Sequence, residues 1–134
     1  MFVEQIYTKC LAEAAYYIES NGEVAVIDPL REVEPYIQMA KERGAKIKYV
    51  FETHFHADFV SGHIDLAKQT GATIVFGPNA EAGYDIYNGT DGEVFNIGDV
   101  SLTLLHTPGH TLDSCSFFIA KKSAVICGDL VPSA

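Results

Sequence analysis

The sequence has few basic residues and no long apolar run. Of its 134 residues, nine are Lys or Arg and eighteen are Asp or Glu, which gives a net charge of −9 at pH 7 and a pI near 4.8. A phosphate backbone or an anionic membrane would repel such a chain, so neither nucleic acid nor a membrane is an expected partner. No apolar run approaches the roughly 20 residues that span a bilayer, and the first residues form no signal peptide. We therefore expect a cytoplasmic protein.

Cysteine is also scarce. The three cysteines, Cys10, Cys115 and Cys127, are an odd number, and none belongs to a C-x-x-C pair. This pattern indicates neither a disulfide framework nor a zinc site made of thiolates. Cys115 lies in a strand-like apolar run, where burial raises the pKa of a thiol, so we interpret the cysteines as buried thiols. A reactive Cys115 is the alternative.

Length and hydropathy point to one α/β domain. Hydrophobic residues make up 48% of the chain and charged residues 20%, which is typical of a globular protein and not of a disordered one. A chain of 134 residues is long enough for one core and too short for two ordinary domains. Because no repeat, low-complexity tract or linker interrupts it, we predict one unit over 1–134 with no internal boundary.

Turn and helix signals divide the chain into alternating strands and helices. Asn21-Gly22 separates two strand-like runs, and such a pair accepts the positive φ angles of a hairpin turn. Apolar residues recur at helical spacing in 33–40, before Gly44, and again in 60–67, before Gly71. The predicted strands are 2–8, 14–18, 24–27, 47–51, 73–76, 93–97, 101–105, 116–120 and 123–127, and the helical stripes are Val33, Tyr36, Ile37 and Ala40, then Val60, His63, Ile64 and Ala67.

The order of these elements predicts how the strands pair. The first helix lies between two strands, so residues 23–52 form a β-α-β unit with parallel strands and a right-handed crossover. Residues 77–92 are rich in turn signals and are predicted to form a connecting stretch. The later strands are joined in pairs by short turns at Gly98-Asp99 and Lys121-Lys122, which predicts two hairpins.

Residues that bind metals follow three of the predicted strands. His54, His56 and Asp58 come directly after one strand, His110 stands in a Pro-Gly turn after another, and Asp129 follows a glycine at the end of a third. Imidazole and carboxylate ligands suit divalent ions such as Zn(II) and Fe(II), and a set of two His and one Asp leaves positions open for water, O₂ or substrate. The pattern predicts a metal site in which His54, His110 and Asp129 are the strongest candidate ligands.

Other polar residues near these motifs allow more than one interpretation. His56 and Asp58 are either direct ligands or groups that orient the bound histidine. His63 lies on the apolar stripe of the second helix, where a hydrogen-bonded core histidine is the favoured interpretation. His106 shares a strand face with leucines and is interpreted as packing or as supporting a ligand. Asp28, before a proline at a strand end, either caps the next helix or bonds to a metal-bound histidine.

The three motifs resemble the metallo-β-lactamase superfamily. They are Thr53-His54-Phe55-His56-Ala57-Asp58, then Thr107-Pro108-Gly109-His110-Thr111, then Gly128-Asp129, in the order and spacing of that family. The wider run from Glu52 to His63 looks most like the persulfide dioxygenase branch, particularly its rhodanese-fused forms. The resemblance covers about Phe2 to Asp129. It implies an αββα sandwich with the metal at one edge of the two sheets.

The resemblance also implies a reaction. In the persulfide dioxygenases a single Fe(II) is held by two His and one Asp, which map to His54, His110 and Asp129, with Zn(II) as the alternative metal. His56 and Asp58 would orient ligands and pass protons as catalytic residues. Such enzymes oxidise a thiol persulfide, commonly that of glutathione, with O₂ to sulfite and the free thiol. A rhodanese partner would accompany the full-length fused form.

Two departures from the family pattern modify this expectation. Phe59 stands where many two-metal relatives have a histidine, and because it cannot bind a metal it favours a mononuclear site over a zinc hydrolase of the glyoxalase II type. The chain also stops shortly after Asp129, so we expect only the N-terminal portion of the sandwich, with a sheet face that pairs in a homo-oligomer. The zinc hydrolase or thioesterase, and an inactive metal-binding module, are the alternative functions.

Overall fold

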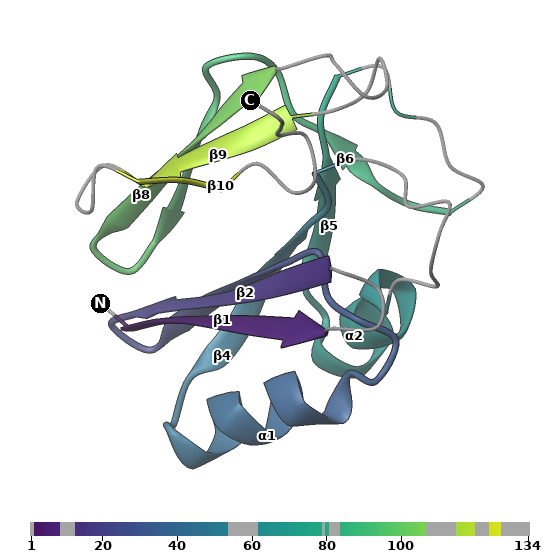
Figure 1. Ribbon diagram of the computed structural model, residues 1–134, viewed down its shortest axis with the longest axis vertical. Helices are drawn as coiled ribbons and strands as arrows, with labels where there is room; N and C mark the ends of the chain where they lie inside the picture. The colour runs from purple at the N-terminus through teal and green to yellow at the C-terminus, as the bar shows by residue number, and fades with distance from the viewer. Residues whose placement is uncertain are drawn as a thin grey trace.

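A computed structural model describes residues 2–8, 13–53, 62–78, 80, 84–106, 115–119 and 124–126 (Figure 1). These residues form a six-stranded sheet, a four-stranded sheet and two helices. The elements are β1 (Phe2–Thr8), β2 (Glu13–Ser20), β3 (Glu23–Ile27), α1 (Glu34–Glu42), β4 (Lys46–Phe51), α2 (His63–Thr70), β5 (Thr73–Phe76), β6 (Tyr87–Asn88), β7 (Val94–Ile97), β8 (Val100–His106), β9 (Cys115–Ile119) and β10 (Ala124–Ile126).

The six-stranded sheet begins with the predicted hairpin. Asn21 and Gly22 have φ angles of 49° and 80°, and β2 and β3 pair antiparallel on either side of them. On the other side of β2, β1 pairs antiparallel along its whole length. The Asn-Gly pair was therefore enough to predict this hairpin, because few other residue pairs accept two positive φ angles.

The predicted β-α-β unit is confirmed. Helix α1 has a proline in its first turn and is followed by Gly44 with a φ of 69°. Strands β3 and β4 run parallel, with Ile27 opposite Phe51, and β5 adds to β4 in the same direction. Three neighbouring strands therefore end at the same edge of the sheet.

The second helix and the strand after it agree with the sequence only in part. Helix α2 ends at Gly71, whose φ is 76°, as predicted. Its buried residues are His63 and Leu66, whereas Ile64 and Ala67 of the predicted stripe are half-buried. The start of that stripe, Val60, lies outside the described residues. The turn-rich stretch contains the short strand β6. This strand was not predicted, because two residues are too few to show an alternating pattern in the sequence.

The four-stranded sheet is antiparallel throughout, in the order β10-β9-β8-β7. The predicted Gly98-Asp99 turn joins β7 and β8, and β9 pairs with β10 as expected for the last hairpin. Residues 121–122 of that hairpin lie outside the described part of the chain.

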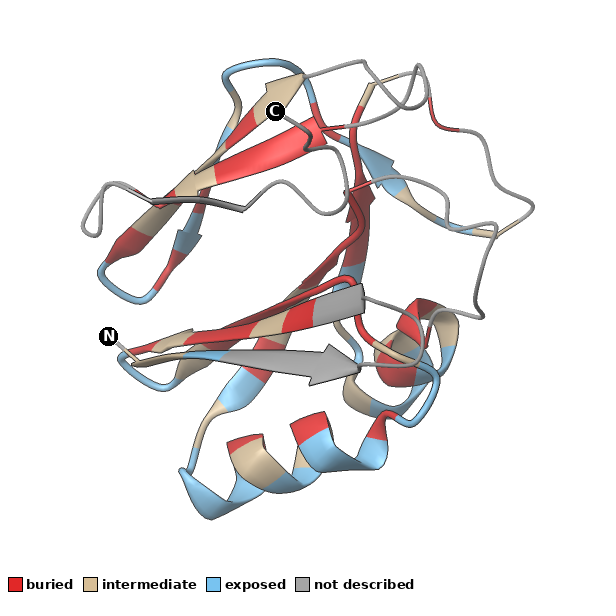
Figure 2. Ribbon diagram, in the orientation of Figure 1, coloured by how far each residue is buried: buried red, intermediate tan, exposed pale blue. Residues whose placement is uncertain are grey.

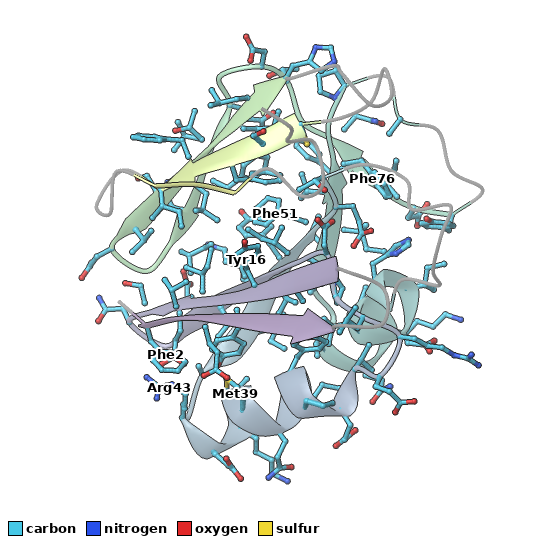
Figure 3. The ribbon with its side chains drawn as sticks, in the orientation of Figure 1. Phe2, Tyr16, Met39, Arg43, Phe51 and Phe76 are labelled. Atoms are coloured by element: carbon cyan, nitrogen blue, oxygen red, sulfur yellow. The ribbon has the colours of Figure 1, made fainter. Side chains whose placement is uncertain are left out.

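Two apolar layers hold the sheets and helices together. Figure 1 shows the two sheets face to face, with α1 and α2 against the outer face of the six-stranded sheet. Buried residues line both faces of that sheet (Figure 2), because neighbouring strand residues point to opposite sides. Phe51 and Tyr16, labelled in Figure 3, lie between the sheets. The layer between the sheets contains Ile18, Ala25, Ile27, Phe51, Val75, Phe95, Ile97, Val100, Leu102, Leu104, Cys115, Phe117 and Ile119, and the layer under the helices contains Ala15, Tyr17, Val24, Val26, Val33, Tyr36, Ala40, Ile47, Val50 and Leu66.

This α-β-β arrangement is the predicted N-terminal portion of an αββα sandwich. Within the described residues, neither helix is long and apolar enough to cross a membrane.

The turns of the two hairpins also contact each other, at the opposite end from the strand ends discussed below. The backbone N–H of Gly98 donates to Glu23 Oε1 at 2.8 Å, and that of Asp99 donates to Ser20 Oγ at 3.1 Å. The bond from Gly98 is the main reason that the pKa of Glu23 lies below its usual range. These contacts set the spacing of the two sheets at this end.

Replacing Gly98 tests that contact. Its φ is 57°, and an added Cβ would lie 2.1 Å from the carbonyl oxygen of Ser20. We expect Gly98→Ala to lower the free energy of unfolding by about 3 kcal/mol, since it adds a backbone clash to left-handed strain. Gly92→Ala is the matched control, because its φ is 87° and its added Cβ meets nothing within 4 Å, and it should cost about 1 kcal/mol. Urea unfolding measures both values, and equal losses would contradict the packing of the two turns.

Candidate functional site

The first metal motif starts from the edge where the parallel strands end. Strand β4 ends at Phe51 and continues through Glu52 and Thr53, which immediately precede His54. The backbone N–H of Glu52 still bonds to the carbonyl of Val75 on β5, at 3.0 Å. Ligand sites of sheets with parallel strands commonly lie outside these carboxyl ends. The edge is therefore well placed for the predicted site.

The second motif is attached to the same edge. His106 at the end of β8 pairs with Cys115 at the start of β9, and these two residues flank the stretch that contains His110. The backbone N–H of Cys115 donates to the carbonyl of Thr53 at 2.8 Å. This bond joins the four-stranded sheet to the end of β4, one residue before His54.

The third motif follows β10, which runs antiparallel to β9. Ile126, the last residue of β10, is paired with Phe117, two residues from Cys115. The polypeptide therefore continues toward Asp129 from the end of the four-stranded sheet at which Cys115 lies. The described residues that flank all three motifs thus converge on one edge of the sandwich.

The predicted ligands and catalytic residues, His54, His56, Asp58, His110 and Asp129, lie outside the described residues, and their roles stay predictions. Among the residues that are described, no three His, Cys, Asp or Glu side chains form a group that could hold a metal. The predicted set of two imidazoles and one carboxylate has donor chemistry that fits Zn(II) or Fe(II).

Asp28 clamps the residue that precedes the first motif. Its Oδ1 accepts the backbone N–H of Thr53 at 2.8 Å and its Oδ2 accepts the Thr53 hydroxyl at 2.6 Å, with both residues buried. Asp28 itself has a φ of 52°, a conformation that Asp tolerates better than most residues. Of its two predicted roles, that of a helix cap is wrong, because the cap position of α1 is Val33 and has no side-chain bond. The Asp side chain instead reaches across to the neighbouring strand end. A bond from Asp28 to a metal-bound histidine stays a prediction.

A buried tyrosine supports the turn after Asp28. The hydroxyl of Tyr36, on α1, accepts the backbone N–H of Leu30 at 2.9 Å. Burial raises the pKa of Tyr36 to about 12, so this hydroxyl stays protonated at neutral pH. The first helix therefore fixes the path of the chain between β3 and α1.

His63 is a buried histidine with hydrogen-bonding neighbours, as predicted. Its Nε2 lies 2.5 Å from the Tyr84 hydroxyl, and its Nδ1 lies 3.7 Å from Oε1 of the buried Glu52. The imidazole meets the ring of Phe76 edge-on, with centroids 5.7 Å apart (Phe76 is labelled in Figure 3). Burial, and after it the charge of Glu52, raises the pKa of Tyr84. The sequence indicated no role for Tyr84, and for Glu52 it gave only a place at the start of the run that resembles the persulfide dioxygenases.

Two further predictions concern Cys115 and His106. Cys115 is buried, with its Sγ 3.7 Å from the carbonyl of Glu52, which confirms the buried thiol. Cys10 and Cys127 lie outside the described residues. His106 is half-buried, and its backbone N–H donates to Asp91 Oδ1 at 2.8 Å. It therefore packs less completely than Leu102 and Leu104 on the same strand, because it lies at the strand end.

A cavity of about 490 Å³ lies between α2 and residues 84–87. Its walls include the apolar side chains of Ile64, Ala67, Ile74 and Ile86, together with Tyr84. Tyr84 thus borders this cavity on one side and contacts His63 on the other.

The fold is a sandwich of two sheets, and the described residues that flank the three motifs meet at one of its edges. This arrangement is typical of a class of metal-binding, hydrolase-like proteins. The chain belongs to the metallo-beta-lactamase superfamily, whose family profile matches residues 8–134. A hydroxyacylglutathione hydrolase from Methylococcus capsulatus is 33% identical over 112 residues, which cover 81% of this chain and 43% of that protein. The chain spans about half the length of the curated relatives it matches.

Solved structures agree with this family. A metallo-beta-lactamase from Staphylococcus aureus has a TM-score of 0.83 and is 34% identical, over 91% of this chain and 39% of its own. ETHE1 from Myxococcus xanthus has a TM-score of 0.81 and is 29% identical, over 90% of this chain and 54% of its own. The similarity to both structures therefore extends over about nine-tenths of the chain.

Substitutions of Asp28 test the clamp on Thr53. Asp28→Ala removes both acceptors from buried donors and leaves alanine with a left-handed backbone, so it should lower the free energy of unfolding by about 3 kcal/mol. Asp28→Asn keeps an oxygen for the Thr53 N–H and should cost about 1 kcal/mol. Urea unfolding of both variants gives the values. A loss below about 1 kcal/mol for Asp28→Ala would show that the clamp contributes little.

Proposed function

We propose that the chain holds one divalent metal through His54, His110 and Asp129 and hydrolyses a thioester of glutathione. The observation that supports the metal site is the convergence, on one edge, of the described residues that flank the three motifs. Curated relatives at 33–38% identity are named hydroxyacylglutathione hydrolases, which supports the thioester substrate and Zn(II) as the metal. This places the hydrolase ahead of the persulfide oxidation to which the sequence motifs gave preference.

The residues of this chain have separate tasks in such a reaction. A bound Zn(II) supplies a Lewis acid and lowers the pKa of its water toward 7. His54, His110 and Asp129 hold the ion, while His56 and Asp58 orient these ligands and accept the proton that the attacking water loses. Asp28 keeps Thr53 in place, and with it the start of the run that carries three of these side chains.

The second candidate is oxidation of a thiol persulfide. Two observations favour it: the likeness to ETHE1, a persulfide dioxygenase, and Phe59 at a position where it cannot bind a second metal. In this reaction a thiol persulfide, O₂ and water give the free thiol, sulfite and two protons. The same three ligands would hold Fe(II), whose open positions suit O₂.

Metal content and two activity assays distinguish these candidates. The protein is expressed in medium that contains both iron and zinc, its metals are measured by mass spectrometry, and it is assayed with S-lactoylglutathione and with glutathione persulfide. We expect about one equivalent of Zn(II) and thioester cleavage. Iron with O₂ uptake and sulfite release would favour the dioxygenase. Metal without either activity would favour the binding module.

Substitution of a predicted ligand gives a direct test of the metal site. Asp129→Ala removes the only carboxylate of the proposed set, so bound metal should fall at least about tenfold and activity should be lost. Asp99→Ala is the matched control, because Asp99 is an exposed carboxylate in the β7–β8 turn. Metal analysis of both purified variants measures the effect, and full occupancy in Asp129→Ala would contradict the assignment.

A further inference from the structure

A short chain of polar side chains includes the residues on either side of the run that carries the first metal motif. It consists of Glu52, which extends β4, His63, which begins α2, and Tyr84. The imidazole lies between the other two groups, with Nδ1 3.7 Å from the Glu52 carboxylate and Nε2 2.5 Å from the Tyr84 hydroxyl. Glu52 is 1% exposed and His63 is 8% exposed.

Burial makes this arrangement costly unless the groups stay together. A buried carboxyl group is stabilised by polar neighbours, and His63 Nδ1 lies 3.7 Å from Glu52, which is within ion-pair range although longer than a hydrogen bond. The ring of His63 is held edge-on against Phe76, and its centroid is 5.4 Å from that of Tyr84. The imidazole therefore has little freedom to turn away from Glu52.

The contact between Glu52 and His63 joins two positions that lie on either side of the first metal motif in the sequence. Glu52 and His63 bracket the run 54–61, which carries His54, His56 and Asp58. The bond from the Gly62 N–H to the carbonyl of Pro29, at 3.1 Å, fixes the same end of the run as His63. A Cβ on Gly62 would lie 2.3 Å from the carbonyl oxygen of Leu30, so α2 begins in direct contact with the turn after Asp28.

We infer that His63 is a positioning residue, which holds together the two ends of the run that carries the first metal motif. Joining the ends lowers the conformational entropy of the run before the metal binds, so less binding free energy is needed to order the ligands. His63 acts in this way through Glu52 and touches no reacting atom. The inference rests on the proposed metal site and adds a residue that the metal motifs do not contain.

Two substitutions of His63 separate its two nitrogens. In His63→Gln the side-chain amide nitrogen replaces Nε2 and the group that faces Glu52 is lost. In His63→Asn the amide nitrogen replaces Nδ1, so the contact with Glu52 is kept and the one with Tyr84 is lost. If the Glu52 contact holds the run, the two variants will differ in metal affinity and not only in stability.

The experiment titrates Zn(II) alone into each metal-free protein in competition with a chromophoric chelator, and urea unfolding of the metal-free proteins is measured in parallel. His63→Gln should weaken Zn(II) binding about tenfold or more, whereas His63→Asn should stay within about threefold of the unsubstituted protein. Tyr17→Phe is the remote control, because it removes a hydroxyl that donates to Glu19 at 3.0 Å on another part of the sheet. It should change the urea midpoint and leave the affinity unchanged.

A second variant keeps the test open if His63→Gln does not fold. Glu52→Gln keeps the shape of the side chain and removes its charge, and it should also weaken Zn(II) binding by more than about threefold. Zn(II) binding by the unsubstituted protein together with unchanged affinity in His63→Gln or Glu52→Gln would overturn the positioning role alone. Absence of Zn(II) binding in the unsubstituted protein would overturn the proposed function and this inference together.

Discussion

The hydrogen bonds of Thr53 are the interactions on which the arrangement of the two sheets at the motif edge depends. Its N–H and hydroxyl bond to Asp28 at the end of β3, and its carbonyl accepts the N–H of Cys115 at the start of β9. One residue therefore connects two parallel strands to the opposite sheet. Because all of these groups are buried, each bond that is lost would leave an unsatisfied donor or acceptor in the interior. That cost maintains the geometry of the edge.

The apolar layers decide where this edge lies, and the polar contacts decide how it is arranged. Alternation along β2, β3 and β4 sends one set of side chains toward the other sheet and the next set toward the helices. This burial drives the association of the layers but has little directional preference. The contacts of Glu23 with the Gly98 turn at one end, and of Thr53 at the other, fix the distance and register between the sheets.

The two candidate reactions require the same protein scaffold and differ in the metal. Both place a thiol-derived substrate beside one ion held by two His and one Asp, and both use an open coordination position. Phe59 cannot bind a metal, which favours the mononuclear site expected from the sequence, whereas the curated relatives are named hydroxyacylglutathione hydrolases. Which chemistry takes place therefore depends on the ion and on its remaining ligands more than on the fold.

Local signals in the sequence determined most of the elements. Asn21-Gly22, Gly44 and Gly71 marked turns and helix ends because their backbone conformations are restricted to few residue types, and the spacing of His and Asp at strand ends indicated a metal site. Cytoplasmic location, a homo-oligomer, a rhodanese partner and a thiol persulfide ligand stay predictions. Only the tertiary structure decided the role of Asp28, the burial of Glu52 and the contact of His63 with Tyr84. These depend on groups 11 to 25 residues apart meeting in space, and the sequence within one turn or strand carries no information about such meetings.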